Sequence, residues 1–215
     1  EGVPRKYENK VFKIGNILKK EIINFEKKPF KEDDKKLHIL VLGGSQAAQI
    51  FAEKLPSIFK QCADQDIKLK IYQHCLPNQN KELSLFYQNA QIEFEIFNFS
   101  DNILDYLTKA NLAITRSGSS MLAELTNANI PFISIPLPSS ADNHQLKNAM
   151  YYQTKNFSFL IEEKDLNDKL FNLIKEIHQN NTILDNIILS QRQYSDKNVY
   201  NNINQVLKIL FNEKN

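Results

Sequence analysis

The feature that most constrains this chain is the run LHILVL at residues 37–42, which two glycines follow at once. A strand that is apolar at nearly every position is typical of a parallel sheet covered on both faces. Beyond Gly43 and Gly44, apolar residues return with the spacing of a helix face: Ala47, Ala48, Ile50, Phe51 and Leu55. The segment therefore predicts a strand, a tight turn and a helix, which is the repeating unit of α/β folds.

The same alternation continues along the chain and sets the fold class. Apolar runs predict further strands at residues 67–72, 92–97, 112–115, 131–136 and 157–161, with helical patterns between them. The strand at 92–97 alternates in part, so we expect it nearer an edge. Strands and helices in this rhythm predict an α/β fold, a Rossmann-like parallel sheet flanked by helices.

Three segments follow from the same pattern. Residues 1–36 predict a linker, with a short helix over 17–25 and a charged hinge from Lys27 to Lys36 that contains Pro29. Residues 37–165 predict the sheet domain. Residues 166–215 read as helical throughout.

Composition restricts the function classes. The 215 residues are 42% hydrophobic and 24% charged, as in ordinary soluble globular proteins, and the net charge of +2 is too small to argue for a nucleic-acid partner. No apolar run approaches the roughly 18 residues of a membrane helix, so any membrane association would be peripheral.

Cys62 and Cys75 lack metal-type or redox-type spacing, which favours a reduced cytosolic setting. A disulfide between them remains an open alternative. No ligand cluster predicts a metal site, no cofactor is indicated, and no nucleophile–base pair is evident.

The first candidate binding element follows the strand at 112–115. Arg116, Ser117 and Gly118 form a polar turn, and Ser119 or Ser120 is expected to cap the helix behind it. A helix start of small residues presents free backbone N–H groups and a positive end, which suit an anionic or hydroxyl-rich ligand.

Glu124 lies in the second turn of the same predicted helix. A carboxylate there is badly placed to hold phosphate but well placed to accept two hydroxyl hydrogens, as from a ribose. The alternatives are a salt-bridged loop around Arg116 and a solvated Glu124.

The glycine turn at residues 43–46 is the second candidate. Its glycines let the backbone approach a phosphate and Ser45 can donate to it, whereas the alternative is an ordinary tight turn. A nicotinamide site is disfavoured because the next strand ends in Gln73 and His74 in place of an acidic residue. His74 follows a strand and can approach a ligand, while His38 is expected to be packed and His178 to be solvated.

The third candidate is the donor- and acceptor-rich segment at residues 142–145, which follows Pro136 and Pro138. Such a segment can read sugar hydroxyls, although helix capping by Asp142 is the simpler alternative. All three candidates, together with residues 99–103, fall at the carboxyl ends of predicted parallel strands. Ligands bind at that edge of open α/β sheets, so the segments together predict a nucleotide-sugar cleft.

These segments carry a resemblance to a known family. Residues 39–48 resemble the Gly-Gly-Ser-Gln-Gly-Ala loop of the MurG family, the transferases that add N-acetylglucosamine from UDP to lipid I and so form lipid II for peptidoglycan. Further matches lie at Gly15-Asn16, residues 99–103, residues 116–124 and residues 136–145, and all the matches occur in the same order as in the family. The resemblance spans the chain from about Gly15 to Ile161.

The resemblance implies the carboxyl-terminal, donor-binding half of a GT-B glycosyltransferase, with residues 1–36 as inter-domain linker and remnant of the preceding half. It implies a hexosyltransferase that inverts the sugar's anomeric centre. The helix start behind Ser117 and Gly118 would stabilise the leaving UDP in place of a metal. The remaining donor contacts it implies are Ser45 and Gln46 at the diphosphate, Ser100 at uracil, Arg116 on the nucleotide side, Glu124 at the ribose, and His144 and Gln145 at the N-acetylglucosamine hydroxyls.

Three positions depart from the family pattern. Lys19 stands where the family has an arginine after Gly-Asn, so it keeps the charge without the planar fork. Ala47 replaces the third glycine of the loop, and Asn129 replaces a glycine that a left-handed asparagine can stand in for.

Nothing in the chain resembles the family's amino-terminal half, and the first residue is Glu1. We therefore expect a fragment or processed chain, cytosolic by itself. The lipid-linked acceptor, the general base and peripheral contact with the cytoplasmic face of the bacterial inner membrane would belong to the missing half. The resemblance also links the chain to cell wall biogenesis, cell shape and cell division. Two alternatives stay open: the donor subunit of a split transferase acting on another polyprenyl-linked sugar, and a non-catalytic UDP-sugar-binding remnant.

Overall fold

The computed structural model describes residues 5–27, 36–43, 45–98, 103–180, 182–194, 196 and 198–212. It does not describe the side chains of residues 6, 9, 45–48 and 212. None of the helices in these ranges is long and apolar enough to cross a membrane.

A six-stranded sheet forms the centre of the molecule. Its strands are β1 (Leu37–Leu42), β2 (Leu69–His74), β3 (Glu93–Phe97), β4 (Leu112–Thr115), β5 (Phe132–Ser134) and β6 (Ser158–Leu160). Their order is β3-β2-β1-β4-β5-β6, and every pairing is parallel. The predicted parallel α/β fold is confirmed, and β3 lies at an edge as expected. Because the crossovers change direction at β1, the carboxyl ends of β1 and β4 form the topological switch point of the sheet.

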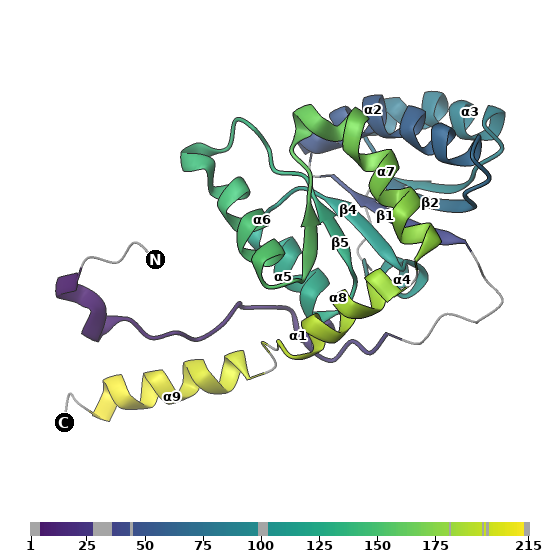
Figure 1. Ribbon diagram of the computed structural model, residues 1–215. Coiled ribbons are helices and arrows are strands. Elements are labelled where there is room, and N and C mark those ends of the chain that lie inside the picture. The colour runs from purple at the N-terminus through teal and green to yellow at the C-terminus, as the bar shows by residue number, and fades with distance from the viewer. Residues whose placement is uncertain are drawn as a thin grey trace.

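Helices cover both faces of the sheet (Figure 1). One face carries α2 (Ser45–Ala63), α3 (Asn80–Asn89) and α7 (Leu166–Gln179); the other carries α1 (Lys20–Ile23), α4 (Ile103–Lys109), α5 (Ser119–Asn127) and α6 (His144–Thr154). α8 (Thr182–Arg192) and α9 (Val199–Asn212) complete the chain, with short 3-10 turns η1 (Arg5–Lys10), η2 (Pro77–Gln79), η3 (Ala141–Asn143) and η4 (Glu163–Asp165).

β1 shows why its apolar run folds in this way. Ile39 and Val41 pack into the layer beneath α2 and α7, whereas Leu40 and Leu42 pack into the opposite layer. Successive side chains of a strand point to opposite faces, so a strand covered on both sides must be apolar throughout. His38 in the same strand is buried and its Nδ1 lies 3.3 Å from the Tyr72 hydroxyl, which confirms that it is packed.

Several predicted elements have different bounds in the structure: β3, β5 and β6 are shorter at one or both ends, and β2 and the first helix differ as well. β2 begins at Leu69 because Ile67, expected in the strand, instead closes the end of α2: its N–H donates to the Cys62 carbonyl after a left-handed Asp66 (φ 58°). The helix expected over 17–25 is reduced to α1, since its N-cap Lys19 is still extended (φ −62°, ψ 143°) and Leu18 is buried before the helix begins. Both cysteines are buried and free.

The division of the chain at residue 165 stays a prediction. α7 lies beyond that point, yet its apolar face belongs to the same buried layer as α2 and β1. Leu170, Ile174 and Ile177 of this helix are fully buried.

The first and last parts of the chain are joined by a polar latch, which we define as Gly15, Asn16, Asn127, Tyr194 and Asp196. The Asn16 N–H and side-chain amide donate to the two Asp196 carboxylate oxygens at 3.0 and 2.9 Å. The Asn127 amide donates to the same carboxylate at 3.2 Å, and its carbonyl accepts from the Asp196 N–H at 3.0 Å. Asp196 is only 5% exposed, so the latch fixes the linker against α5 and the start of α9.

Candidate functional site

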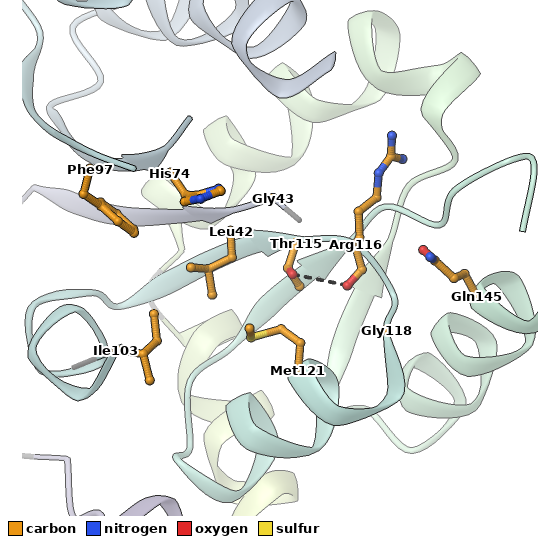
Figure 2. Close-up of a pocket in the computed structure, with 10 residues that line it drawn as sticks. All are labelled: Leu42, Gly43, His74, Phe97, Ile103, Thr115, Arg116, Gly118, Met121 and Gln145. Carbon is orange, nitrogen blue, oxygen red and sulfur yellow. Dashed lines mark hydrogen bonds between the residues drawn. The ribbon is translucent and has the colours of Figure 1, made fainter. Parts of the chain in front are cut away.

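A cavity of about 390 Å³ opens at the switch point of the sheet. Its size lies within the usual range for small-molecule sites. Figure 2 shows that its walls come from the ends of several strands and the start of α5. The lining residues are Leu42, Gly43, His74, Phe97, Ile103, Thr115, Arg116, Gly118, Met121 and Gln145.

The start of α5 faces this cavity without a side-chain cap. The expectation that Ser119 or Ser120 caps the helix is wrong, because the helix begins at Ser119 and its N-cap is Gly118 (φ −68°, ψ 132°) with no side-chain hydrogen bond. The first-turn N–H groups of a helix have no intrahelical acceptor. These N–H groups can therefore donate to a ligand in the cavity, and such a set of free donors favours an anion.

Two side chains of α6 hold Ser117 in place, one through its backbone N–H and one through its carbonyl. Its N–H donates to Gln145 Oε1 at 3.2 Å, and its carbonyl accepts from Asn148 Nδ2 at 3.0 Å. Gln145 Oε1 also accepts from the Leu137 N–H at 3.0 Å. Since two backbone donors fix which end of the Gln145 amide is the oxygen, the Nε2 end is the one left to donate to a ligand.

Arg116 contributes its backbone to the cavity, while its side chain points the other way (Figure 2). The guanidinium donates to the carbonyls of Ile135 (3.3 Å) and Pro136 (3.2 Å) and pairs with Glu163 at 2.5 Å. Its carbon lies 5.1 Å from the centre of the Phe51 ring, a cation–π contact.

Glu124 lies one turn beyond Met121 on α5, and residues three apart share a helix face. It therefore lies beyond the cavity wall in the direction of α1. Burial raises the pKa of the Glu124 carboxyl, and the positive charge of Lys19 acts in the opposite direction. Lys19 is the N-cap of α1 and is exposed. The structure thus places Lys19 and Glu124 close enough to interact, from segments about a hundred residues apart.

The turn before α6 differs from its prediction. Asp142 does not cap the helix: it has φ 49° within η3, and the N-cap is Asn143 with φ 54° and no side-chain hydrogen bond. Short polar side chains tolerate this left-handed geometry, which allows the tight turn. His144 is exposed and its Nδ1 lies 2.8 Å from the Ala141 carbonyl. Because a carbonyl only accepts, Nδ1 carries the proton, and a neutral His144 offers Nε2 as an acceptor.

An apolar wall closes the other end of the cavity. Phe97 stacks on Tyr106 with ring centres 4.0 Å apart, and His74 lies 5.8 Å from Phe97. Sequence reasoning assigned no role to Phe97 or Met121 and only a weak one to His74. The sequence signal that could have found them is position: His74 and Phe97 each end a strand, and Met121 lies on the first turn of a helix.

The cavity brings together Arg116, Gly118 and Gln145 among the predicted site residues, with Ser117 beside them. Glu124, Lys19 and His144 lie outside its lining. Gly44 and Ser100 lie outside the described residues, and so do the side chains of Ser45 and Gln46. The donor-binding roles of all these residues stay predictions. Among the described residues no group of three or more His, Cys, Asp or Glu side chains could hold a metal ion.

An all-parallel sheet of this order, covered by helices on both faces, defines a Rossmann-like α/β domain. Within that class the chain belongs to glycosyltransferase family 28, since the model of the glycosyltransferase family 28 C-terminal domain matches residues 38–203.

Similar proteins agree with this assignment. The UDP-N-acetylglucosamine–N-acetylmuramyl-(pentapeptide) pyrophosphoryl-undecaprenol N-acetylglucosamine transferase of Pelagibacter ubique (strain HTCC1062) is 33% identical over 214 residues, which are 98% of this chain and 58% of the relative. The transferase of the same name from Rickettsia bellii (strain RML369-C) is 30% identical, over 96% of this chain and 60% of the relative. The chain thus spans about three fifths of the length of these relatives.

A solved structure confirms the fold. The crystal structure of MurG from Acinetobacter baumannii superposes with a TM-score of 0.72 at 23% identity, covering 82% of this chain and 51% of that one.

Proposed function

We propose that this chain binds UDP-N-acetylglucosamine as the donor half of an inverting glycosyltransferase that converts lipid I into lipid II. The observation that carries the proposal is the uncapped start of α5, which opens into the switch-point cavity with Glu124 one turn beyond Met121. Free N–H groups suit a diphosphate, and a half-buried carboxylate next to them suits a ribose. The names of the Pelagibacter and Rickettsia relatives supply the donor sugar and the acceptor.

In this proposal the donor lies across the carboxyl edge of the sheet. The diphosphate contacts Ser117 and Gly118, which lead into α5, and Ser45 and Gln46, the first residues of α2. The uracil contacts Ser100, as the family resemblance implies, and packs on the apolar wall at Phe97 and Ile103. The ribose hydroxyls donate to Glu124, with Lys19 across from it.

The sugar is read by two adjacent residues with complementary groups. Gln145 Nε2 donates, because its oxygen is already engaged by Ser117 and Leu137. His144 Nε2 accepts when the ring is neutral, because Nδ1–H is directed at the Ala141 carbonyl. A hydroxyl both donates and accepts, so one donor and one acceptor side by side suit neighbouring sugar hydroxyls.

The reaction requires a second half. The acceptor's hydroxyl oxygen forms a bond to the anomeric carbon, the bond from that carbon to UDP breaks, and the hydroxyl proton passes to a base. Charge develops on the leaving diphosphate, where preorganised N–H dipoles at the start of α5 would lower the barrier. The lipid-linked acceptor, the base and the contact with the cytoplasmic face of the membrane would come from the segment that the relatives have and this chain does not span.

Calorimetry with UDP-N-acetylglucosamine tests the donor site directly. We expect the wild-type chain to bind, and Glu124→Ala to bind roughly ten- to a hundredfold more weakly, since a charge-assisted hydrogen bond contributes about 1.5–3 kcal/mol.

The matched control is Glu82→Ala, which removes an exposed carboxylate from the first turn of α3 and leaves the site untouched. It should bind like the wild type. Folded wild-type protein that gives no heat would refute the donor site.

A further inference from the structure

Both terminal nitrogens of the Arg116 guanidinium are engaged inside the protein, whereas its buried Nε has no hydrogen-bond partner among the described residues. The guanidinium contacts two carbonyls, Glu163 and the Phe51 ring, and the Arg116 and Glu163 side chains are only 11% and 20% exposed. In Figure 2 the guanidinium points away from Met121 and Ile103, and so away from the apolar part of the cavity. For Arg116 to bind a ligand, it would have to leave Glu163 as a part-buried, unpaired charge, which is costly.

The two carbonyls that accept from Arg116 lie just before the segment that contains the predicted sugar-binding residues. Ile135 and Pro136 directly precede residues 137–145, which we call the sugar-reading loop. The first residue of that loop, Leu137, donates its N–H to the last, Gln145. Gln145 in turn accepts from Ser117, the neighbour of Arg116. The contacts form a closed ring in which Arg116 fixes the entry to the loop and Gln145 fixes its exit.

We propose that Arg116, oriented by Glu163, is a positioning residue for the sugar-reading loop and does not bind the diphosphate. The planar fork of an arginine serves two carbonyls from one terminal nitrogen and a carboxylate from the other, whereas the donors of a lysine all lie on a single nitrogen. The identity of the ligand rests on the proposed function, whereas the ring of contacts does not.

The test compares UDP with UDP-N-acetylglucosamine, because only the second ligand carries the sugar that the loop would contact. For Arg116→Gln and Glu163→Gln we expect affinity for UDP-N-acetylglucosamine to fall about tenfold and affinity for UDP to stay within about twofold. Arg116→Lys should behave like Arg116→Gln. The matched control is Asp165→Asn, which removes a neighbouring carboxylate of η4 whose partner is Lys169 at 2.7 Å.

The opposite pattern would overturn the proposal. A direct diphosphate ligand would make Arg116→Gln weaken both compounds alike, while Glu163→Gln would leave both unchanged or would strengthen them by freeing the guanidinium. Equal weakening of both ligands by the two variants would also count against it.

A measurement without ligand separates this proposal from the donor-site proposal. Amide hydrogen exchange in residues 137–145 should rise about tenfold in both variants and not in Asp165→Asn. Glu163→Gln keeps the side chain's size and serves if Arg116→Gln fails to fold. Increased exchange in a protein that binds neither ligand would refute the donor site alone, whereas unchanged exchange would refute the positioning role.

Discussion

At the scale of single residues, Glu124 combines two opposing influences. Burial disfavours its charged form and raises its pKa, while Lys19 favours the charged form. The folded state therefore holds the Glu124 proton more tightly than the unfolded state does. By linkage, this group favours folding at pH values below its unfolded pKa, and the contribution is lost as the pH rises through the folded pKa.

The affinity for the donor should change with pH in the opposite direction to this contribution to stability. Ribose hydroxyls need the carboxylate as an acceptor, so affinity for UDP-N-acetylglucosamine should fall as the pH drops from neutral through the raised pKa of Glu124. The ligand adds no titration here, because both of its phosphates are esterified. Calorimetry across this range on wild type and Glu124→Gln checks the prediction.

Glu124→Gln should bind more weakly at the upper pH and depend less on pH. The slope that remains in this variant belongs to other groups. An unchanged slope would show that Glu124 does not titrate with binding.

At the scale of elements, the sequence predicted what depends on local burial. β4 has the predicted bounds, 112–115, because a mostly apolar strand that is buried at every position between two layers needs little information from elsewhere in the chain. The caps of α5 and α6 were mispredicted because Ser119, Ser120 and Asp142 are all good capping residues in isolation. Their backbone positions were decided by the turns before them.

The site was predictable in its location and less so in its contacts. The switch-point edge follows from strand order and small-residue turns. In contrast, the double role of Gln145 depends on N–H groups from two loops that meet only in the folded chain. The same holds for Arg116, whose partner Glu163 lies 47 residues away and belongs to no motif.

α7 provides a stability prediction for an element beyond the expected sheet domain. Ile174 is fully buried in the layer shared with α2, so Ile174→Ala should lower the free energy of unfolding by about 2–5 kcal/mol. Leu207 on α9 is 44% exposed, and Leu207→Ala should change it by no more than about 0.5 kcal/mol. Urea unfolding measures both values.

A single transition that shifts with Ile174→Ala would show that α7 unfolds with the sheet. Two separate transitions in the wild type would instead support a boundary at residue 165.

At the scale of the whole molecule, the latch joins residues 15 and 16 to Asp196, which shortly precedes α9. Gly15 has φ 96°, and a Cβ at this position would lie 2.6 Å from Asp196 Oδ1. We expect Gly15→Ala to destabilise the protein by about 1–3 kcal/mol, because it combines a left-handed backbone with a displaced carboxylate. The midpoint of urea unfolding measures the effect.

Gly118→Ala is the matched control for that variant. Gly118 has an ordinary φ of −68° and open space where a Cβ would lie, so only a helix-cap preference of less than about 1 kcal/mol is at stake. Equal losses in both variants would contradict the role of the latch.

The latch also sets an order of events during synthesis. Asp196 is made 180 residues after Asn16, about 10 to 40 s later at the usual rate of translation. All six strands lie between these two residues, so the sheet can form before the latch does. A ribosome that stalls before Asp196 would therefore hold a chain with a formed sheet in which residues 15 and 16 are not yet fixed by the latch.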